Sequence, residues 1–116
     1  ADKCFLNVKG GEHAAEFMTI TFNVTPWFAK YCPAVTHVDG TARPHLVSKE
    51  VNPRYYKIIK EYEKISGIPT IVNTSYNMHE EPIVCTPDDA IRSFKDGKLD
   101  YLAIGNYLVK NEEMKK

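Results

Sequence analysis

The sequence predicts an α/β (α+β) fold, in which a twisted mixed sheet packs with two main helices. Two segments, 52–67 and 86–97, carry matched helix start and stop residues. Short runs of β-favouring residues lie before, between and after these segments. The chain has 116 residues, of which 43% are hydrophobic, and this suits one domain over 1–116 with a single core. Its charged end, 111–116, is expected to fray.

The composition excludes several classes of function. The 15 basic and 15 acidic residues cancel, so no global charge favours binding to nucleic acid or to an anionic membrane. No apolar run approaches the ~18 residues of a membrane span, and no charged-then-apolar leader opens the chain. Cys4, Cys32 and Cys85 are odd in number and far apart, which favours reduced thiols. We therefore expect a cytoplasmic protein.

The N-terminal half is expected to supply strands. Apolar and polar side chains alternate from Met18 to Val24, which predicts a half-buried strand that Pro26 ends. Segment 34–47 predicts a hairpin, because Asp39-Gly40 is a strong signal for a type I′ turn. In that register Val38 faces Thr41, and four side chains share one face: Thr36, Val38, Thr41 and Arg43.

Both helices have clear boundary residues. Asn52 is expected to cap the first and Gly67 to end it, while Thr86 caps the second and Gly97 ends it. A proline directly follows each cap, where its fixed φ suits the first turn. An apolar stripe runs along the first helix at helical spacing, through Tyr55, Ile58, Ile59, Tyr62 and Ile65.

Further strands are expected after each helix. The β-branched run Ile68 to Val72 predicts an interior strand, and Ile83 to Cys85 is a second, shorter candidate. After the second helix, Leu99 to Ile104 and Tyr107 to Val109 predict two strands that a turn at Gly105-Asn106 joins.

A polar run directly follows the expected interior strand. Open α/β sheets bind ligands beyond the carboxyl ends of their strands, so this run is a candidate phosphate, ribose or amide site. Its hydroxyls and amides belong to Asn73, Thr74, Ser75 and Asn77. The alternative is a turn that merely caps the strand end, and spacing alone favours this alternative.

Arg43 is the second candidate, because its guanidinium could bind a phosphate or carboxylate with two parallel hydrogen bonds. The alternative is a solvated strand arginine.

His37 and Asp39 could converge as an acid–base pair, but they meet no zinc spacing rule, so no protein metal site is expected. Cys85 could act as a nucleophile, but it adjoins an apolar strand, where cysteine is usually a small buried hydrophobe. The residues by themselves thus indicate an anion or nucleotide site joining Arg43 to the 73–77 loop.

Five sequence blocks, in this order, resemble a known family. They are Pro-Ala-Val-Thr-His-Val-Asp-Gly-Thr-Ala-Arg (33–43), Asn-Pro-Arg-Tyr-Tyr (52–56), Asn-Thr-Ser-Tyr-Asn (73–77), Glu-Pro-Ile-Val-Cys-Thr-Pro-Asp-Asp-Ala (81–90) and Ile-Gly-Asn-Tyr-Leu-Val (104–109). Together, from about Phe17 to Val109, they resemble the C-terminal, YrdC-like region of the NodU/CmcH family of O-carbamoyltransferases.

The resemblance implies a function in natural product biosynthesis. The C-terminal domain of that family makes carbamoyl-adenylate from carbamoyl phosphate and ATP, with Mg²⁺ bound largely through substrate oxygens. An actin-like N-terminal domain, which holds iron, passes the carbamoyl group to a hydroxyl of a small acceptor molecule. Carried over to matching positions, Arg43 and Ser75 are the catalytic candidates. The nucleotide-site candidates are Arg43, Asn73 and Ser75, with Thr41 and Asn77 as weaker ones.

This sequence departs from the family pattern in ways that affect the expectation. The basic stretch that completes the ATP site and the N-terminal domain both lie outside the chain, so we expect an inactive C-terminal fragment of a carbamoyltransferase. Pro44-His45 replaces an apolar residue and Gln, and Glu80 stands where Gly is usual. A sheet edge or apolar face exposed by truncation would favour a homodimer.

Two other functions remain open on the sequence. YrdC-like domains also make threonylcarbamoyl-adenylate for tRNA modification, although the neutral charge and the particular motif set favour the O-carbamoyltransferase. The other alternative is a non-catalytic module or lid that packs on a partner domain.

Overall fold

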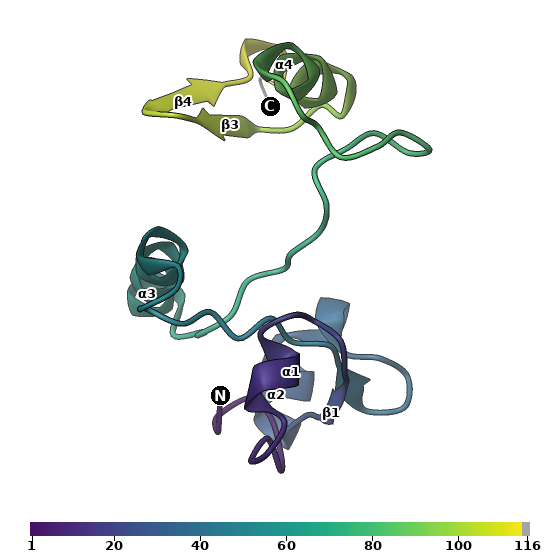
Figure 1. Ribbon diagram of the computed structural model, residues 1–116, viewed down its shortest axis with the longest axis vertical. Coiled ribbons are helices and arrows are strands. Elements are labelled where there is room, and N and C mark those ends of the chain that lie inside the picture. The colour runs from purple at the N-terminus through teal and green to yellow at the C-terminus, as the bar shows by residue number, and fades with distance from the viewer. Residues whose placement is uncertain (115–116) are drawn as a thin grey trace. The chain divides into compact units, whose positions relative to one another are not determined.

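The chain folds as two compact units, residues 1–72 and residues from 73 onward, and the computed structural model describes residues 1–114 (Figure 1). The α+β class is confirmed, since short helices and antiparallel strand pairs occur in both halves of the sequence. The elements in chain order are α1 (Glu12–Ala15), β1 (Phe22–Asn23), α2 (Pro26–Tyr31), η1 (Pro33–Val35, a 3₁₀ helix), β2 (Thr41–Ala42), α3 (Pro53–Ser66), α4 (Pro87–Asp96), β3 (Tyr101–Ile104), β4 (Tyr107–Lys110) and η2 (Glu112–Met114, also 3₁₀).

The core of the first unit forms around α2 and the β1–β2 pair. These strands are antiparallel, with Phe22 opposite Ala42, and α1, α2 and β1 gather in one part of the unit (Figure 1). The Phe5 and Phe28 rings lie with their centroids 5.1 Å apart. Burial of this apolar surface stabilises the unit by about 25 cal/mol per Å². The buried members of the cluster are Cys4, Phe5, Val8, Val24, Phe28, Cys32 and Ala42.

Helix α2 was not expected from the sequence, although its start signals are present. The Thr25 hydroxyl accepts a hydrogen bond from the backbone N–H of Phe28 at 3.1 Å, and Pro26 occupies the first helical position. This capping geometry satisfies one of the free N–H groups of the helix start. Pro26 therefore begins a helix and does not end a strand as the sequence predicts, and only the two residues of β1 remain of the strand predicted from Met18 to Val24.

Helix α3 has the boundaries that the sequence predicts. Asn52 Oδ1 accepts from the N–H of Tyr55 at 3.2 Å, and Gly67 ends the helix with φ of 72°, a conformation that favours glycine. Its apolar stripe, however, contributes no buried residue, since the exposed fraction reaches 60% at Ile58 and 88% at Ile65.

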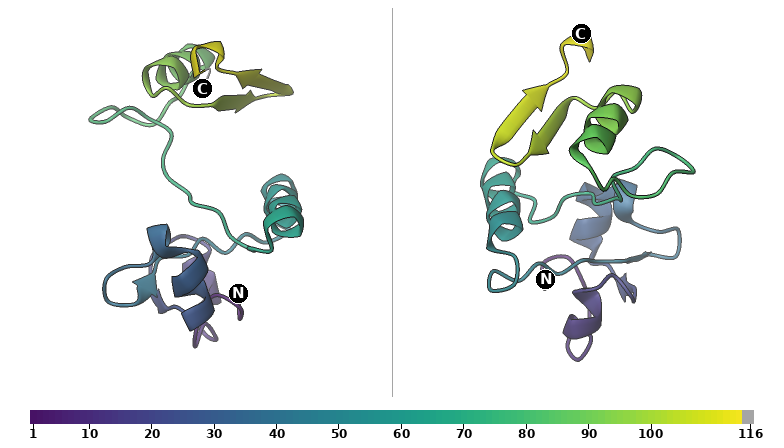
Figure 2. Two further views of the ribbon diagram at one scale, coloured as in Figure 1. Left: turned by 180° about the vertical axis from the view of Figure 1, so that it is seen from behind. Right: turned by 45° about the horizontal axis from the view of Figure 1, so that its top comes forward.

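The helices and strands of the second unit are α4, the β3–β4 hairpin and η2, and they follow the loop that begins at Asn73 (Figure 2). Helix α4 packs against β3, with Ala90, Phe94 and Leu102 buried. Thr86 and Asp89 form a capping box at the helix start, as their types and spacing favour. Tyr107 pairs with Ile104 across the hairpin, and Gly105 takes φ of 57° in the connecting turn, as the sequence predicts.

Several predicted strands are wrong. Ile68–Val72 and Ile83–Cys85 form no strand and have no ladder partner among residues 1–114, and Pro33–Val35 forms η1 where the sequence predicts the first hairpin strand. The strands observed form two separate pairs. The physical reason is that a strand needs a partner, which local propensity does not supply. At the C-terminal end, the backbone N–H of Asn111 donates to Asp100 O at 2.9 Å, and residues 115–116 of the segment expected to fray lie outside the described residues.

Candidate functional site

The His-Val-Asp-Gly-Thr-Ala-Arg block forms a tight turn with a different register from the predicted one. The N–H of His37 donates to Thr41 O at 2.7 Å, and the N–H of Gly40 donates to His37 O at 3.0 Å. The loop therefore contains Val38, Asp39 and Gly40, with Gly40 at φ of 77°. His37, rather than Val38, stands opposite Thr41, which corrects the predicted two-residue turn and its shared face.

The Thr41 hydroxyl is the centre of a small polar cluster in this turn. It donates to Asp39 Oδ1 at 2.8 Å, and His37 Nδ1 lies 2.9 Å from the same hydroxyl oxygen. The N–H of Thr41 also donates to Asp39 Oδ1, at 3.0 Å. These hydrogen bonds, first from the hydroxyl and then from the backbone N–H, lower the pKa of Asp39 below its usual value.

Arg43 lies just beyond β2 with its side chain exposed. Ala42 is buried at 3% exposure, so strand alternation directs Thr41 and Arg43 to the opposite, outer side. Among the described residues, the Arg43 guanidinium makes no hydrogen bond or ion pair. An arginine with five unengaged donors on an exposed strand end is able to bind an anion with two parallel hydrogen bonds.

The polar run 73–77 belongs to the second unit. Asn73 and Ser75 are exposed, and Ser75 makes no side-chain hydrogen bond with the described residues. Asn77 has a different role, because its Nδ2 donates to Met78 O at 2.9 Å and to Glu81 O at 3.0 Å. Its amide hydrogens thus close the loop that follows the run, and its Oδ1 is the part left to accept from a ligand.

This loop is anchored to helix α4 by two contacts. The phenol of Tyr76 donates to Ala90 O at 2.5 Å, and Arg92 Nη1 lies 2.9 and 2.8 Å from the two carboxylate oxygens of Glu81. The pKa of Arg92 is raised, first by this hydrogen bonding and then by the charge of Glu81. The anchoring leaves Ser75 at the exposed end of a loop whose base is held.

The candidate residues therefore fall into two groups. Thr41 and Arg43 lie together on the outer side of the turn in the first unit, while Asn73, Ser75 and Asn77 lie together in the second. A single pocket that contains both groups stays a prediction. His37 belongs with the first group, because its imidazole contacts the Thr41 hydroxyl. The spacing of His37 from Asp39 and Thr41 around the turn is the feature of the sequence that could have predicted this contact.

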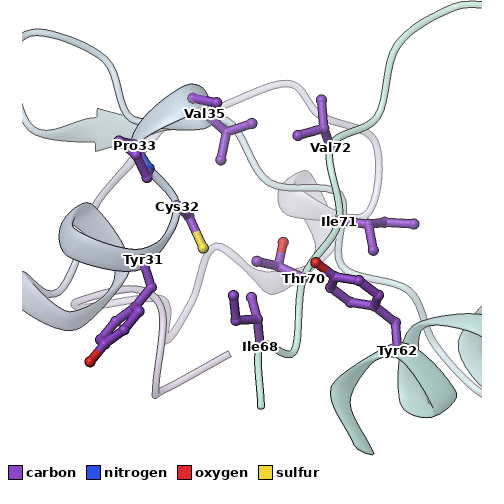
Figure 3. Close-up of a pocket in the computed structure, with 10 residues that line it drawn as sticks. Tyr31, Cys32, Pro33, Val35, Tyr62, Ile68, Thr70, Ile71 and Val72 are labelled. Carbon is purple, nitrogen blue, oxygen red and sulfur yellow. The ribbon is translucent and has the colours of Figure 1, made fainter. Parts of the chain in front are cut away.

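A cavity of about 160 Å³ lies elsewhere in the first unit, between the end of α2 and the extended segment after α3 (Figure 3). Cys32 and Val35 lie on one wall, and Tyr62, Ile68 and Thr70 lie on the facing wall. The lining is mostly apolar and contains none of the predicted site residues. Burial raises the pKa of Cys32 and Cys4, so both buried thiols are poor nucleophiles.

Cys85 is exposed, which corrects the expectation of a buried small hydrophobe, and all three cysteines are free. Within residues 1–114 no three His, Cys, Asp or Glu side chains are grouped so that they could hold a metal ion. No helix in that range combines the length and the apolar character that crossing a membrane requires.

Comparison with known proteins places the chain in a family. It is 42% identical over 95 residues to an uncharacterized protein of Methanocaldococcus jannaschii, an alignment that covers 82% of this chain and 16% of that protein. It is 38% identical over 106 residues to nodulation protein NolO of Bradyrhizobium diazoefficiens, with 91% of this chain and 19% of NolO covered. For nodulation protein U of Rhizobium tropici the identity is 30% over 98 residues, with 84% and 16% covered.

The chain thus spans less than a fifth of the length of these relatives. A family model described as carbamoyltransferase C-terminus matches residues 1–111, which include every candidate site residue. The resemblance found in the five sequence blocks is confirmed, and the chain belongs to the carbamoyltransferase C-terminus family.

Proposed function

We propose that this chain supplies part of the site at which an O-carbamoyltransferase makes carbamoyl-adenylate from carbamoyl phosphate and ATP. The observation that carries the proposal is the unengaged guanidinium of Arg43, exposed on the outer side of the turn within the segment that matches the family. Exposed polar groups at Asn73 and Ser75, in the same matched segment, add support. The acceptor of the carbamoyl group is a hydroxyl of a small molecule.

The atoms of this reaction balance when one water enters. Water cleaves carbamoyl phosphate to carbamate and phosphate. A carbamate oxygen then attacks the α-phosphorus of ATP, the bond to the β-phosphate oxygen breaks, and pyrophosphate leaves with that bonding pair. The acceptor hydroxyl oxygen later attacks the carbamoyl carbon, loses its proton, and releases AMP.

The residues of this chain act by binding and by stabilising charge. Arg43 holds phosphate or carbamate oxygens with two hydrogen bonds, and its fixed positive charge is most useful where negative charge grows in the adenylation transition state. The Ser75 hydroxyl and the Asn73 amide bind the nucleotide phosphates. Asn77 lines the site through its amide oxygen, and Thr41 lines it beside Arg43 on the outer side of the turn. Mg²⁺ arrives with ATP and is held mainly by phosphate oxygens.

The complete site needs a partner domain, in our proposal an actin-like N-terminal domain with a basic segment, contained in a longer protein. The relatives are more than five times as long as the part that this chain matches, which is consistent with such a partner. Alone, the chain is expected to release no pyrophosphate from ATP and carbamoyl phosphate, because positive charge for the triphosphate is missing.

The experiment uses a longer protein that carries this sequence and measures pyrophosphate release from ATP as a function of carbamoyl phosphate. Arg43→Met should lower kcat/KM by roughly 100-fold or more, the usual loss when a group that stabilises developing charge is removed. Arg54→Met is the matched control, since Arg54 is also exposed and lies on α3. It should change kcat/KM by less than about twofold.

Equal rates in the two variants would contradict the proposal. So would a rate with bicarbonate plus threonine that exceeds the rate with carbamoyl phosphate, which would favour threonylcarbamoyl-adenylate chemistry. Folded protein with no pyrophosphate release under either condition would favour a non-catalytic module.

A further inference from the structure

Three side chains form a continuous hydrogen-bonded chain on the surface of the turn that leads to Arg43. His37 Nδ1 lies 2.9 Å from Thr41 Oγ1, and Thr41 Oγ1 lies 2.8 Å from Asp39 Oδ1. The backbone holds this arrangement, because the N–H of His37 donates to Thr41 O at 2.7 Å and sets the two residues opposite each other. We call His37, Thr41 and Asp39 the turn relay.

Counting hydrogens in the relay determines where each proton lies. An ionised carboxylate only accepts hydrogen bonds, and an aspartate such as Asp39 is ionised at neutral pH. The single hydroxyl hydrogen of Thr41 therefore lies on the contact with Asp39, and Oγ1 offers only lone pairs to His37. A lone pair on Nδ1 would then face a lone pair on Oγ1, so Nδ1 must carry the hydrogen.

The other ring nitrogen is consequently the free acceptor. In a neutral imidazole one nitrogen carries the hydrogen and the other a lone pair, and the hydrogen bond made by one nitrogen sets the state of the other. Nε2 of His37 thus carries the lone pair, on a side chain that is exposed. Within the described residues, the contact with Thr41 is the only hydrogen bond that the His37 side chain makes.

We propose that the turn relay locks His37 in the Nδ1–H tautomer, so that Nε2 accepts a hydrogen bond from the carbamoyl N–H of the substrate whose anionic oxygens Arg43 binds. The ligand half of this inference rests on the proposed function, whereas the tautomer does not. His37 and Arg43 are both exposed, and both flank Thr41 on the outer side of the strand end. A carbamoyl group suits them because it joins an N–H donor to oxygen acceptors.

The relay also assigns Thr41 a role other than ligand donor. Its hydroxyl hydrogen is committed to Asp39 and its oxygen to His37, so substrate contact passes through the imidazole. Thr41 and Asp39 are positioning residues in this scheme. His37 is the residue that touches the carbamoyl group.

The tautomer is measured by ¹⁵N NMR of the 116-residue chain with ¹⁵N-labelled histidine, at a pH of about 8 where an ordinary imidazole is neutral. We expect His37 to show a protonated-type shift at Nδ1 and an unprotonated-type shift at Nε2. Thr41→Val and Asp39→Ala should both move the ring toward the Nε2–H form. Thr36→Val is the matched control, because Thr36 Oγ1 donates to Cys32 O at 3.0 Å and takes no part in the turn relay. This variant should leave the tautomer unchanged.

The ligand half is measured with the longer protein, by the KM for carbamoyl phosphate. His37→Asn keeps an N–H near the Nδ1 position and loses the Nε2 lone pair, so KM should rise about tenfold, the value of one hydrogen bond. His37→Gln places an amide oxygen near the Nε2 position and should stay within about threefold of the native KM.

The outcomes separate the two halves. An Nε2–H ring in the native chain, or a tautomer that ignores Thr41→Val, would overturn the relay. If the native chain shows the Nδ1–H tautomer but His37→Asn and His37→Gln have equal KM values, the carbamoyl contact is wrong and the relay stands. Failure of the proposed function itself would appear as absent pyrophosphate release with the tautomer still as expected.

Discussion

The phenol oxygen of Tyr76 lies 2.5 Å from the carbonyl oxygen of Ala90 and donates to it, which fastens the loop carrying Asn73 and Ser75 to helix α4. The backbone of Tyr76 is held as well, since Val84 N donates to Tyr76 O at 3.0 Å. Burial raises the pKa of the phenol, so the neutral donor form persists. The contribution of Tyr76 to stability is therefore present below the ordinary tyrosine pKa and is lost as the pH rises through the raised value.

Replacing Tyr76 by Phe tests this anchor. We expect the free energy of unfolding to fall by about 1 kcal/mol, the usual net value of one hydrogen bond, and amide exchange to become faster at Val84. Urea unfolding followed by the NMR signals of α4 measures the first effect. Tyr101→Phe is the control, because Tyr101 is 56% exposed and its hydroxyl makes no hydrogen bond within residues 1–114. Equal losses in both variants would contradict the anchor.

Glu80 occupies a backbone conformation that favours glycine, with φ of 64°. This positive φ gives a physical reason why the family pattern has glycine directly before the block at 81–90, where this sequence has Glu80. A residue with a Cβ in this region costs roughly 1 kcal/mol. Glu80→Gly should therefore be more stable than Glu80→Ala by about 1 kcal/mol in urea unfolding. The comparison removes the carboxylate from both variants, and a Glu80→Ala protein as stable as Glu80→Gly would show that no strain exists.

The start of α4 should respond to pH through Asp89. Its carboxylate accepts from the Thr86 hydroxyl at 2.7 Å and from the Thr86 N–H at 3.1 Å, and these two bonds lower its pKa. Because the pKa of Asp89 is lower in the folded protein than in the unfolded chain, its carboxylate stabilises the fold at any pH above the ordinary aspartate pKa. This stability is lost as the pH falls through the lower pKa of the folded protein. A ¹³C titration of the carboxyl carbon measures the pKa directly.

Thr86→Ala should move that pKa of Asp89 back toward its ordinary value, because the strongest donor is gone. It should also lower the stability of the second unit by about 1 kcal/mol, the typical value of a helix cap. Thr86→Ser keeps the hydroxyl and should preserve both properties. An unchanged Asp89 titration in Thr86→Ala would refute this account of the capping box.

Ser93 lies in the core of the second unit at 2% exposure, and its hydroxyl makes no hydrogen bond within the described residues. A buried polar group without a partner costs about 1–3 kcal/mol, so Ser93→Ala should raise the free energy of unfolding by about 1 kcal/mol. Ser66→Ala is the opposite case, since Ser66 Oγ donates to Tyr62 O at 2.7 Å and accepts from Ile68 N at 3.1 Å. It should destabilise the end of α3, and urea unfolding distinguishes the two signs.

Local signals in the sequence were sufficient for both long helices and for the C-terminal hairpin. The caps at Asn52 and Thr86 act within one turn of the chain, and Gly67 and Gly105 adopt the positive φ values that their turns require. The order of the five sequence blocks was also sufficient to predict the family to which the chain belongs. These features depend on residues only a few positions apart in the chain, so the sequence alone is enough to predict them.

Tertiary structure alone decided how extended segments pair and which side chains meet. Ile68–Val72 has strong β propensity but finds no ladder partner within residues 1–114, and α2 begins at a proline that equally suits a strand end. One extra residue in the turn placed His37 opposite Thr41, and a one-residue change of register exchanges the faces of a strand. Pairing and register are set by partners that lie far away in the sequence or by the exact count of loop residues, and propensity encodes neither.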